Sequence, residues 1–397
     1  MSGERQQVDP EDTFEGEESL GGEFRDDLTS SEPNDSSIYP DATVNIAPES
    51  ASVYQLKRKH DKIPSLLKLD PDFQRHILWS PKQKSELIES ILMGIPLPLI
   101  YVKEDDKGVY IIVDGRQRLT TLFEFMNHKF PLQNLVVLTT LNGAYFSNTS
   151  KDGTTFDTSL AQSHQSKIED CPLTLHVIKP PTQDRVTFDL FDRVNRGGTR
   201  LNNQEMRNAI YQGAATKLLN TLVTFDSFKE ATEHSVKPKR MKDTYLILRM
   251  IVFYLWRKGK LLSVNEKGCP LVEYRSDLQD FLGKTMVFLN DQRGSSFCEE
   301  FPTMFDRAMK SCVTILGSGC FRLPKKGDGP RRAISMALFE IVSYLMITLI
   351  DLPQSQAVSI KDKLTKLLSK KEFVDSIAYI VDSNKSVNKR FKDIEIM

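Results

Sequence analysis

The apolar pattern of the chain changes at about residue 215, and this change constrains the fold more than any other feature. Before it, apolar segments of strand length at 97–103, 109–113 and 173–178 stand among segments with helical spacing. After it, apolar residues recur at helical spacing in segments near 214–233, 241–258, 274–290, 298–316, 331–350 and 355–382. The sequence therefore predicts an α+β domain over residues 51–215 and an all-α domain over residues 216–397.

The first 50 residues differ from the rest of the chain in charge. Residues 1–50 hold 14 acidic and two basic residues, a net charge of −12, and the remainder carries +12, so that the whole chain is neutral. The segment has no apolar periodicity, and we expect it to be a disordered acidic tail. A basic body behind an acidic tail points to a polyanionic partner.

Three features indicate a cytoplasmic protein that does not contact a membrane. The N-terminus has no apolar run of the kind that signal peptides contain. The five cysteines form no Cys-x-x-Cys pair, which favours ordinary intracellular thiols over zinc ligands or disulfides. The most apolar stretch, residues 333–350, contains Glu340 and several Ser and Thr residues, so it predicts a buried helix rather than a membrane span.

A strand that runs through an Asp-Gly turn into a helix carries the residues best suited to chemistry. The strand expected at 109–113 is followed by Asp114, Gly115, Arg116, Gln117 and Arg118. Free N–H groups at a helix N-terminus favour anions, and Gly115 lets a ligand approach the backbone. Arg116 and Arg118 suit phosphate oxygens, while Asp114 could hold Mg²⁺, position water or orient an arginine. Taken alone, the spacing favours the simpler interpretation, an ordinary turn with solvated arginines.

A second loop, rich in glycine, lies between two segments of helical spacing at 183–194 and 203–212. It contains Asn195, Arg196, Gly197, Gly198 and Thr199. Such a loop could bind phosphate through its backbone, or it could simply be a helix C-cap with glycine at the turn.

Together the two segments resemble the N-terminal domain of GmrSD-type modification-dependent restriction enzymes. The likeness covers roughly residues 53–250 and rests on residues Phe73 to Arg75, Trp79, the segment 87–98, residues 114–118, Asn195 to Gly198, Leu201, Glu205, Arg207 and Asn208. It implies a fold similar to ParB and sulfiredoxin that carries an Asp-Gly-Gln-Gln-Arg motif. In that family the motif is tied to nucleotide hydrolysis and, in some members, to DNA cleavage.

Carried over residue by residue, the resemblance implies one nucleotide site built from two loops. Asp114 and Arg118 would be catalytic, with Asp114 also the Mg²⁺ ligand. The residues that would bind the NTP are Arg75, Gly115, Arg116, Gln117, Asn195, Arg196, Gly197, Gly198 and Thr199. Asp114 and Asn195 are then expected to line a common cleft. Arg116 replaces the usual glutamine of the family motif, which adds a positive charge at the phosphate site.

The C-terminal half lacks the nuclease that many relatives carry. No histidine follows His234, so a His-Asn-His nuclease is excluded from residues 235–397. This absence favours a separate nuclease subunit or a nucleotide-driven regulator, and we expect an NTP-hydrolysing, DNA-associated protein. The alternative is a non-enzymatic, ParB-like nucleotide- or DNA-binding scaffold that serves such a nuclease.

Overall fold

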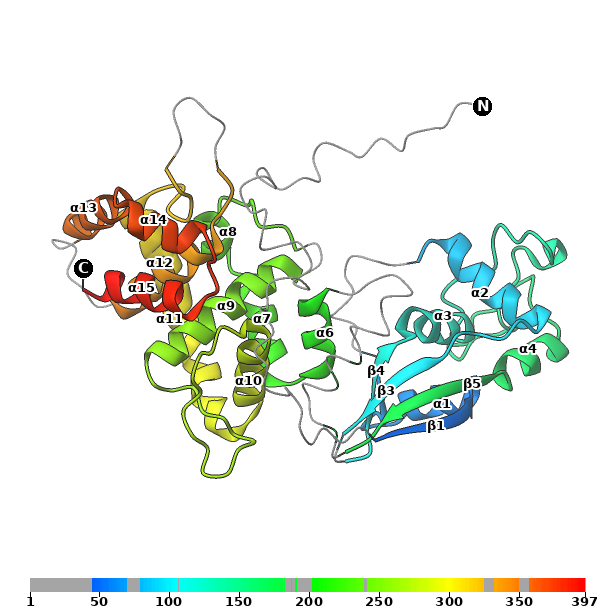
Figure 1. Ribbon diagram of the computed structural model, residues 1–397. Helices are drawn as coiled ribbons and strands as arrows, with labels where there is room; N and C mark the ends of the chain where they lie inside the picture. The colour runs from blue at the N-terminus through cyan, green and yellow to red at the C-terminus, as the bar shows by residue number, and fades with distance from the viewer. Residues whose placement is uncertain are drawn as a thin grey trace, which may run out of the picture. The chain divides into compact units, whose positions relative to one another are not determined.

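The computed structural model describes residues 45–69, 79–105, 107–180, 202–238, 241–324, 332–349 and 357–396, together with positions 182, 187 and 190. The chain forms two compact units that divide between Ile210 and Tyr211. This division lies a few residues before the boundary expected at 215. The first unit is α+β and the second is helical, so the predicted order of fold types is confirmed (Figure 1).

The first unit contains a five-stranded mixed sheet with the order β1-β5-β3-β4-β2. Its strands are β1 (Ile46–Ser52), β2 (Leu67–Lys68), β3 (Ile100–Glu104), β4 (Tyr110–Asp114) and β5 (Pro172–Ile178). β3 pairs antiparallel with β4 and parallel with β5, and β1 closes one edge antiparallel to β5. β2 pairs parallel with β4 at the other edge. The likeness to ParB and sulfiredoxin stays a prediction.

Helices of the same unit pack together and share a hydrophobic core with the sheet. They are α1 (Val53–Asp61), α2 (Pro81–Met93), α3 (Arg116–Met126) and α4 (Gln162–Glu169), and α6 (Asn203–Ile210) contacts β4. The core joins Ile88 of α2 and Leu122 of α3 to Val102 and Ile112 of the sheet. α2 begins at a capping box that Ser80 and Gln83 form. α3 is therefore fixed against the rest of the domain over its buried face.

The expectation that residues 1–50 are entirely a disordered tail is wrong at its C-terminal end. Ile46–Ser52 forms β1, which pairs with β5 along its whole length. The segment contains Pro48, Glu49 and two serines, so its own β propensity is low. It forms a strand because it lies at the sheet edge, where proline and charged residues are tolerated.

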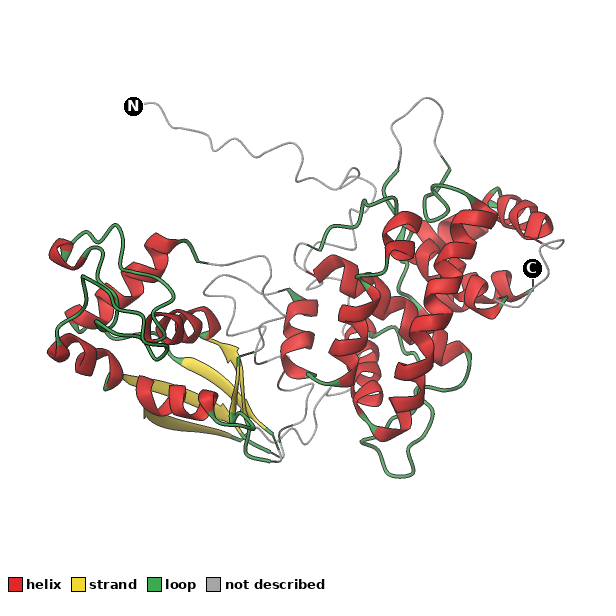
Figure 2. Ribbon diagram, turned by 180° about the vertical axis from the view of Figure 1, so that it is seen from behind, coloured by secondary structure: helices red, strands yellow, loops and turns green. Residues whose placement is uncertain are grey.

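The second unit is built from helices in its described residues, and the strands in Figure 2 all lie in the first unit. The helices are α7 (Ala214–Leu222), α8 (Asp226–Ala231), α9 (Lys242–Arg257), α10 (Leu278–Asn290), α11 (Ser295–Ser311), α12 (Met336–Thr348), α13 (Ala357–Leu368), α14 (Lys371–Ala378) and α15 (Asn384–Glu395). A π-helical turn, Cys312–Leu316, continues α11. Two of the expected helices are each divided in two, and α15 was not expected.

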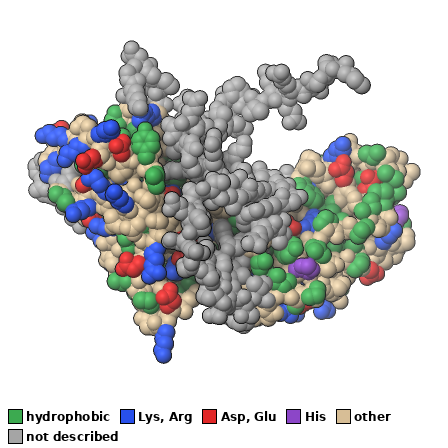
Figure 3. Space-filling view, viewed as in Figure 1, with side chains coloured by type: hydrophobic (Ala, Val, Ile, Leu, Met, Phe, Trp, Pro, Cys, Tyr) green, Lys and Arg blue, Asp and Glu red, His purple; other side chains and the backbone are tan. Residues whose placement is uncertain are grey.

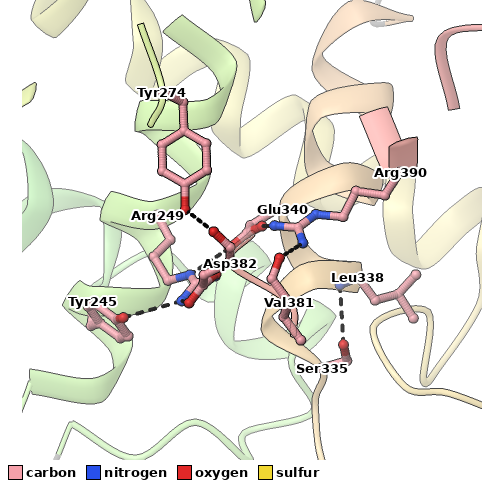
Figure 4. Close-up of polar contacts among 9 residues, drawn as sticks. All are labelled: Tyr245, Arg249, Tyr274, Ser335, Leu338, Glu340, Val381, Asp382 and Arg390. Carbon is pink, nitrogen blue, oxygen red and sulfur yellow. Dashed lines mark hydrogen bonds and ion pairs between the residues drawn. The ribbon is translucent and has the colours of Figure 1, made fainter. Parts of the chain in front are cut away.

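α9 and α12 form the centre of the helical unit, and buried ion pairs connect them to its C-terminal helices (Figure 4). Arg249 of α9 donates from Nε to Glu340 of α12 at 2.5 Å and from Nη2 to Asp382 at 2.6 Å. Arg390 of α15 donates to the other oxygen of Glu340 at 2.6 Å. The hydroxyl of Tyr274 donates to the Asp382 carbonyl. The network therefore joins four separate segments of the chain.

The apolar stretch at 333–350 is a buried helix, as predicted. Its described part forms α12, whose side chains are buried from Met336 to Ile347, Glu340 included. Within the part of the chain that the structure describes, no helix has both the length and the apolar character needed to cross a membrane.

Candidate functional site

The turn between β4 and α3 depends on a glycine. Gly115 has φ of 94° and ψ of 6°, in the left-handed region that other residues rarely adopt. A Cβ atom at this position would lie 2.9 Å from Cγ1 of Ile100, which is itself buried in the core. Both constraints act together, so the chain can pass from Asp114 directly into α3 only with glycine between them.

Arg118 binds back onto the turn that precedes it. Its Nη2 donates to Oδ2 of Asp114 at 2.9 Å and to the Leu99 carbonyl at 2.9 Å. Its Nη1 donates to the Pro98 carbonyl. The Arg118 side chain is only 12% exposed, whereas that of Asp114 is 39% exposed. Arg118 therefore connects the first turn of α3, the end of β4 and the loop before β3.

Burial and ion pairing act on the Arg118 guanidinium in opposite directions. Burial lowers the pKa of Arg118, and the neighbouring Asp114 carboxylate raises it, with burial the larger effect. The guanidinium remains charged at any physiological pH, because arginine starts from so high a pKa. The ion pair consequently keeps Asp114 in one orientation, with its carboxylate partly open to solvent.

This geometry corresponds to one of the three roles that the sequence suggested for Asp114, pairing with an arginine. The two terminal nitrogens of Arg118 already bind Asp114 and two backbone carbonyls. For Arg118 to bind a phosphate through them, the loop at Pro98 and Leu99 would have to release them. The contacts observed are those of a residue that positions Asp114. The carbonyls of Pro98 and Leu99 were not expected to take part, and the only sequence signal for them is that Pro98 ends the 87–98 segment and Leu99 follows it.

Arg116 and Gln117 occupy the first turn of α3, beside the expected phosphate position. Both are half-buried, and both have polar or electrostatic partners within the protein. The backbone N–H groups of this first turn belong to a helix that has no side-chain cap at Gly115. Uncapped N–H groups at a helix start can bind an anion.

Several expected site residues lie outside the described residues. They are Arg75, Asn195, Arg196, Gly197, Gly198 and Thr199. The prediction that Asp114 and Asn195 line a common cleft therefore stays a prediction.

The helix after the glycine-rich loop carries a buried polar cluster. Glu205 and Asn202 exchange backbone and side-chain hydrogen bonds at 2.7 and 2.8 Å, which caps the start of α6. Arg207 donates to Gln204 at 2.8 Å, and Gln204 donates to Asn208 at 2.9 Å. Glu205 therefore lies at the start of α6, and the cluster gives this helix a fixed polar face.

The donor set decides what kind of metal site the turn could offer. Among the described residues, no group of three or more His, Cys, Asp and Glu side chains could hold a metal ion. Mg²⁺ commonly uses only one or two carboxylates and takes its other ligands from phosphates and water. The partly exposed Asp114 carboxylate fits that pattern, in which the nucleotide supplies most of the coordination.

The fold and the turn define an α+β domain in which strand β4 ends at a glycine-dependent helix start without a side-chain cap. Comparison with known families identifies it further: the model of the GmrSD restriction endonuclease N-terminal domain matches residues 55–212. Over this segment the chain is similar to that family, as its motifs predicted. The match ends where the helical unit begins. No curated protein matches the chain, and no solved structure matches it either.

Proposed function

We propose that the chain is an NTP-binding and NTP-hydrolysing, DNA-associated component of a restriction system, acting in the cytoplasm. The observation that carries this proposal is the β4–α3 turn. It combines an uncapped helix start, a glycine whose left-handed backbone turns β4 directly into α3, and an oriented carboxylate. The family match supports a restriction system, and the family's name refers to an endonuclease.

In this proposal each residue of the turn has a distinct task. The backbone N–H groups at the start of α3 and the Arg116 guanidinium receive the nucleotide phosphates. Asp114 holds Mg²⁺ or orients the attacking water, and Arg118 keeps that carboxylate in place. A bound Mg²⁺ would neutralise charge on the phosphate oxygens. Arg75 and the loop from Asn195 to Thr199 would complete the nucleotide site, together with Gly115 and Gln117.

One contact pattern favours the second candidate, a non-enzymatic nucleotide- or DNA-binding scaffold. Arg118 donates to two backbone carbonyls and to Asp114, which are contacts that stabilise the fold without any ligand. In that case the turn would bind nucleotide or DNA without turnover. Under both candidates, cleavage of DNA is left to a separate nuclease subunit.

Turnover by the purified full chain distinguishes the two candidates. NTP hydrolysis with Mg²⁺ is measured with and without DNA, and nucleotide affinity is measured on the same samples. An enzyme should lose about 10²-fold or more of its turnover in Asp114→Asn, with a smaller loss of affinity. Binding without turnover in the unaltered chain would establish the scaffold, and absence of both would overturn the proposal.

A further inference from the structure

A cluster of lysines lies on the surface of the helical unit, outside the segment that the family match covers. Residues 359–371 contain five lysines and one acidic residue, Asp362. The lysines are Lys361, Lys363 and Lys366 on α13 and Lys370 and Lys371 at its junction with α14, and all five are exposed. We call these five residues the lysine ridge. Figure 3 shows basic side chains gathered at the end of the helical unit where α13 and α14 lie.

Four lysines of the ridge have no ion-pair partner in the part of the chain that the structure describes. Among the described residues, no carboxylate lies within ion-pair distance of Lys361, Lys366, Lys370 or Lys371. Elsewhere on the same unit, exposed lysines do pair: Lys310 contacts Asp306 at 2.7 Å. The ridge therefore presents several positive charges that the fold itself does not neutralise.

The composition of the surface excludes a membrane and disfavours a protein as the partner. From Ser359 onward, Ile360, Leu364 and Leu367 of α13 are buried and Leu368 is half-buried, so this part of the helix exposes no apolar face to insert into lipid. Between the lysines the exposed residues are Ser, Thr and Asp, with no aromatic side chain from 359 to 371. Protein interfaces are enriched in aromatic residues and depleted in lysine. Contacts to phosphate, by contrast, rely on Lys, Ser and Thr.

The absence of aromatic residues also separates duplex from single-stranded nucleic acid. Proteins that bind single strands stack the bases on aromatic side chains, and residues 359–371 contain none. A duplex instead offers its phosphates on the outside, where lysines can reach them without contacting bases.

The ridge has a fixed position on the helical unit. Phe373 and Ile377 of α14 are almost fully buried beneath it. Beyond α14, Asp382 is bound to Arg249, and Arg390 to Glu340, within the buried network. Because buried charges are tolerated only beside their partners, this network leaves the C-terminal helices few alternative positions. Rigid support of this kind is what a binding surface requires.

We infer that the lysine ridge on α13 and α14 binds the sugar-phosphate backbone of duplex DNA without regard to sequence. The choice of DNA rests on the proposed function, but the surface is separate from the β4–α3 turn. Binding through lysine and phosphate releases counterions, so the affinity must fall steeply as salt rises.

The test compares two triple variants of the full chain that remove equal charge. The ridge variant is Lys361→Gln, Lys366→Gln and Lys370→Gln. The control is Lys217→Gln, Lys260→Gln and Lys267→Gln, which alters exposed lysines of the same unit outside the ridge. Affinity for a duplex of random sequence and for a single strand of equal length is measured over a range of salt, with melting temperature and NTP turnover on the same samples.

We expect the ridge variant to bind the duplex about tenfold or more weakly at low salt than either the control or the unaltered chain. Its plot of log affinity against log salt should be shallower by roughly 3, about one for each phosphate contact removed. Melting temperature should be unchanged. Equal salt slopes in both variants would overturn the assignment of DNA binding to the lysine ridge. That result would not affect the proposed nucleotide site. Tighter binding to the single strand would overturn the assignment to duplex. A chain that binds DNA through the ridge but hydrolyses no NTP would overturn the proposed hydrolysis alone.

Discussion

Arg118 controls how Asp114 is presented, so its replacement should affect both stability and turnover. Arg118→Ala removes charge-assisted hydrogen bonds from a mostly buried side chain, and we expect unfolding free energy to fall by about 1.5–3 kcal/mol. Arg118→Lys keeps the charge but cannot reach the carboxylate and both carbonyls at once, so it should restore only part of the loss. Chemical denaturation and NTP turnover of the three proteins measure the two effects.

The matched control is an arginine in a similar pair at the surface. Arg293 contacts Asp291 at 3.1 Å, but its side chain is 50% exposed. Arg293→Ala should change unfolding free energy by less than about 1 kcal/mol. If Arg118→Ala lowered the unfolding free energy no more than this control does and left turnover intact, Arg118 would have no positioning role. If it lost only nucleotide affinity and kept full stability, it would be the phosphate ligand that the sequence suggested.

Gly115 is expected to be intolerant of a side chain for two reasons that can be separated. Gly115→Ala forces a left-handed backbone onto alanine and pushes a Cβ against Ile100, and we expect a loss of about 1–3 kcal/mol in unfolding free energy. Gly143 has a similar φ of 85° but no atom near its would-be Cβ. Gly143→Ala should therefore show the backbone contribution alone. Equal losses at the two positions would mean that contact with Ile100 does not matter.

The sequence predicted the turn at the residue level because its determinants are local. A strand, an Asp-Gly pair and a helix with regular apolar spacing are neighbours in the chain, so each can be recognised from a few residues. The partners of Arg118 at Pro98 and Leu99 are some twenty residues away. They come close only through pairing of β3 with β4, which no local pattern encodes. The other half of the expected site lies outside the described residues.

At the level of elements, helix starts were predicted better than helix number. α2 follows its capping box, but the helix expected at 214–233 is two helices, α7 and α8, and that at 355–382 is α13 and α14. α15 was missed because most of its residues are polar, although Val387, Phe391 and Ile394 are buried at helical spacing. Ser383 caps it, so both signals were present but weak. The sequence of β1 contains no comparable signal, because this strand forms through its pairing with β5 at the edge of the sheet.

Glu340 should be the most sensitive position among the C-terminal elements. It is fully buried and binds Arg249 and Arg390, so Glu340→Gln leaves two buried guanidinium groups without their common carboxylate. We expect unfolding free energy to fall by about 3–5 kcal/mol. Glu300→Gln, at an exposed position on α11, should change it by less than about 0.5 kcal/mol. Denaturant titration compares the two variants, and similar small losses in both would show that the network does not stabilise the unit.

Asp382 should make the same elements sensitive to acid. Burial would raise its pKa, but the charge and hydrogen bonds of Arg249, with the charge of Arg390, outweigh burial and hold the pKa below its ordinary value of 3.8. The carboxylate therefore stabilises the fold above that value, and this contribution is lost as pH falls through the lower folded-state pKa. The gap in melting temperature between the unaltered chain and Asp382→Asn should be full at neutral pH and narrow below about 3.8. A gap that widened on acidification would contradict this assignment.

At the scale of the whole molecule, we expect the opposed charges of the tail and the body to determine how strongly the chain binds DNA. Residues 1–44 hold 13 acidic and two basic residues, whereas the rest of the chain is basic and includes the lysine ridge. A polyanionic segment attached to a basic surface competes with DNA for the same lysines. Removing the tail should therefore raise the affinity for duplex DNA at low salt.

We expect the charge of the tail, rather than its bulk, to lower the affinity for duplex DNA. A second variant separates the effect of charge from that of bulk. Deletion of residues 1–44 is compared with a chain of full length in which the tail's Asp and Glu are replaced by Asn and Gln. Both should bind duplex DNA more tightly than the unaltered chain at low salt, and the gain should fade as salt rises, because salt screens the tail and DNA alike. In the ridge variant, the same deletion should produce a smaller gain in affinity for duplex DNA, because fewer lysines remain for which the tail and DNA compete. A gain from deletion alone would point to steric exclusion, and no gain from either change would leave the tail without a role in DNA binding.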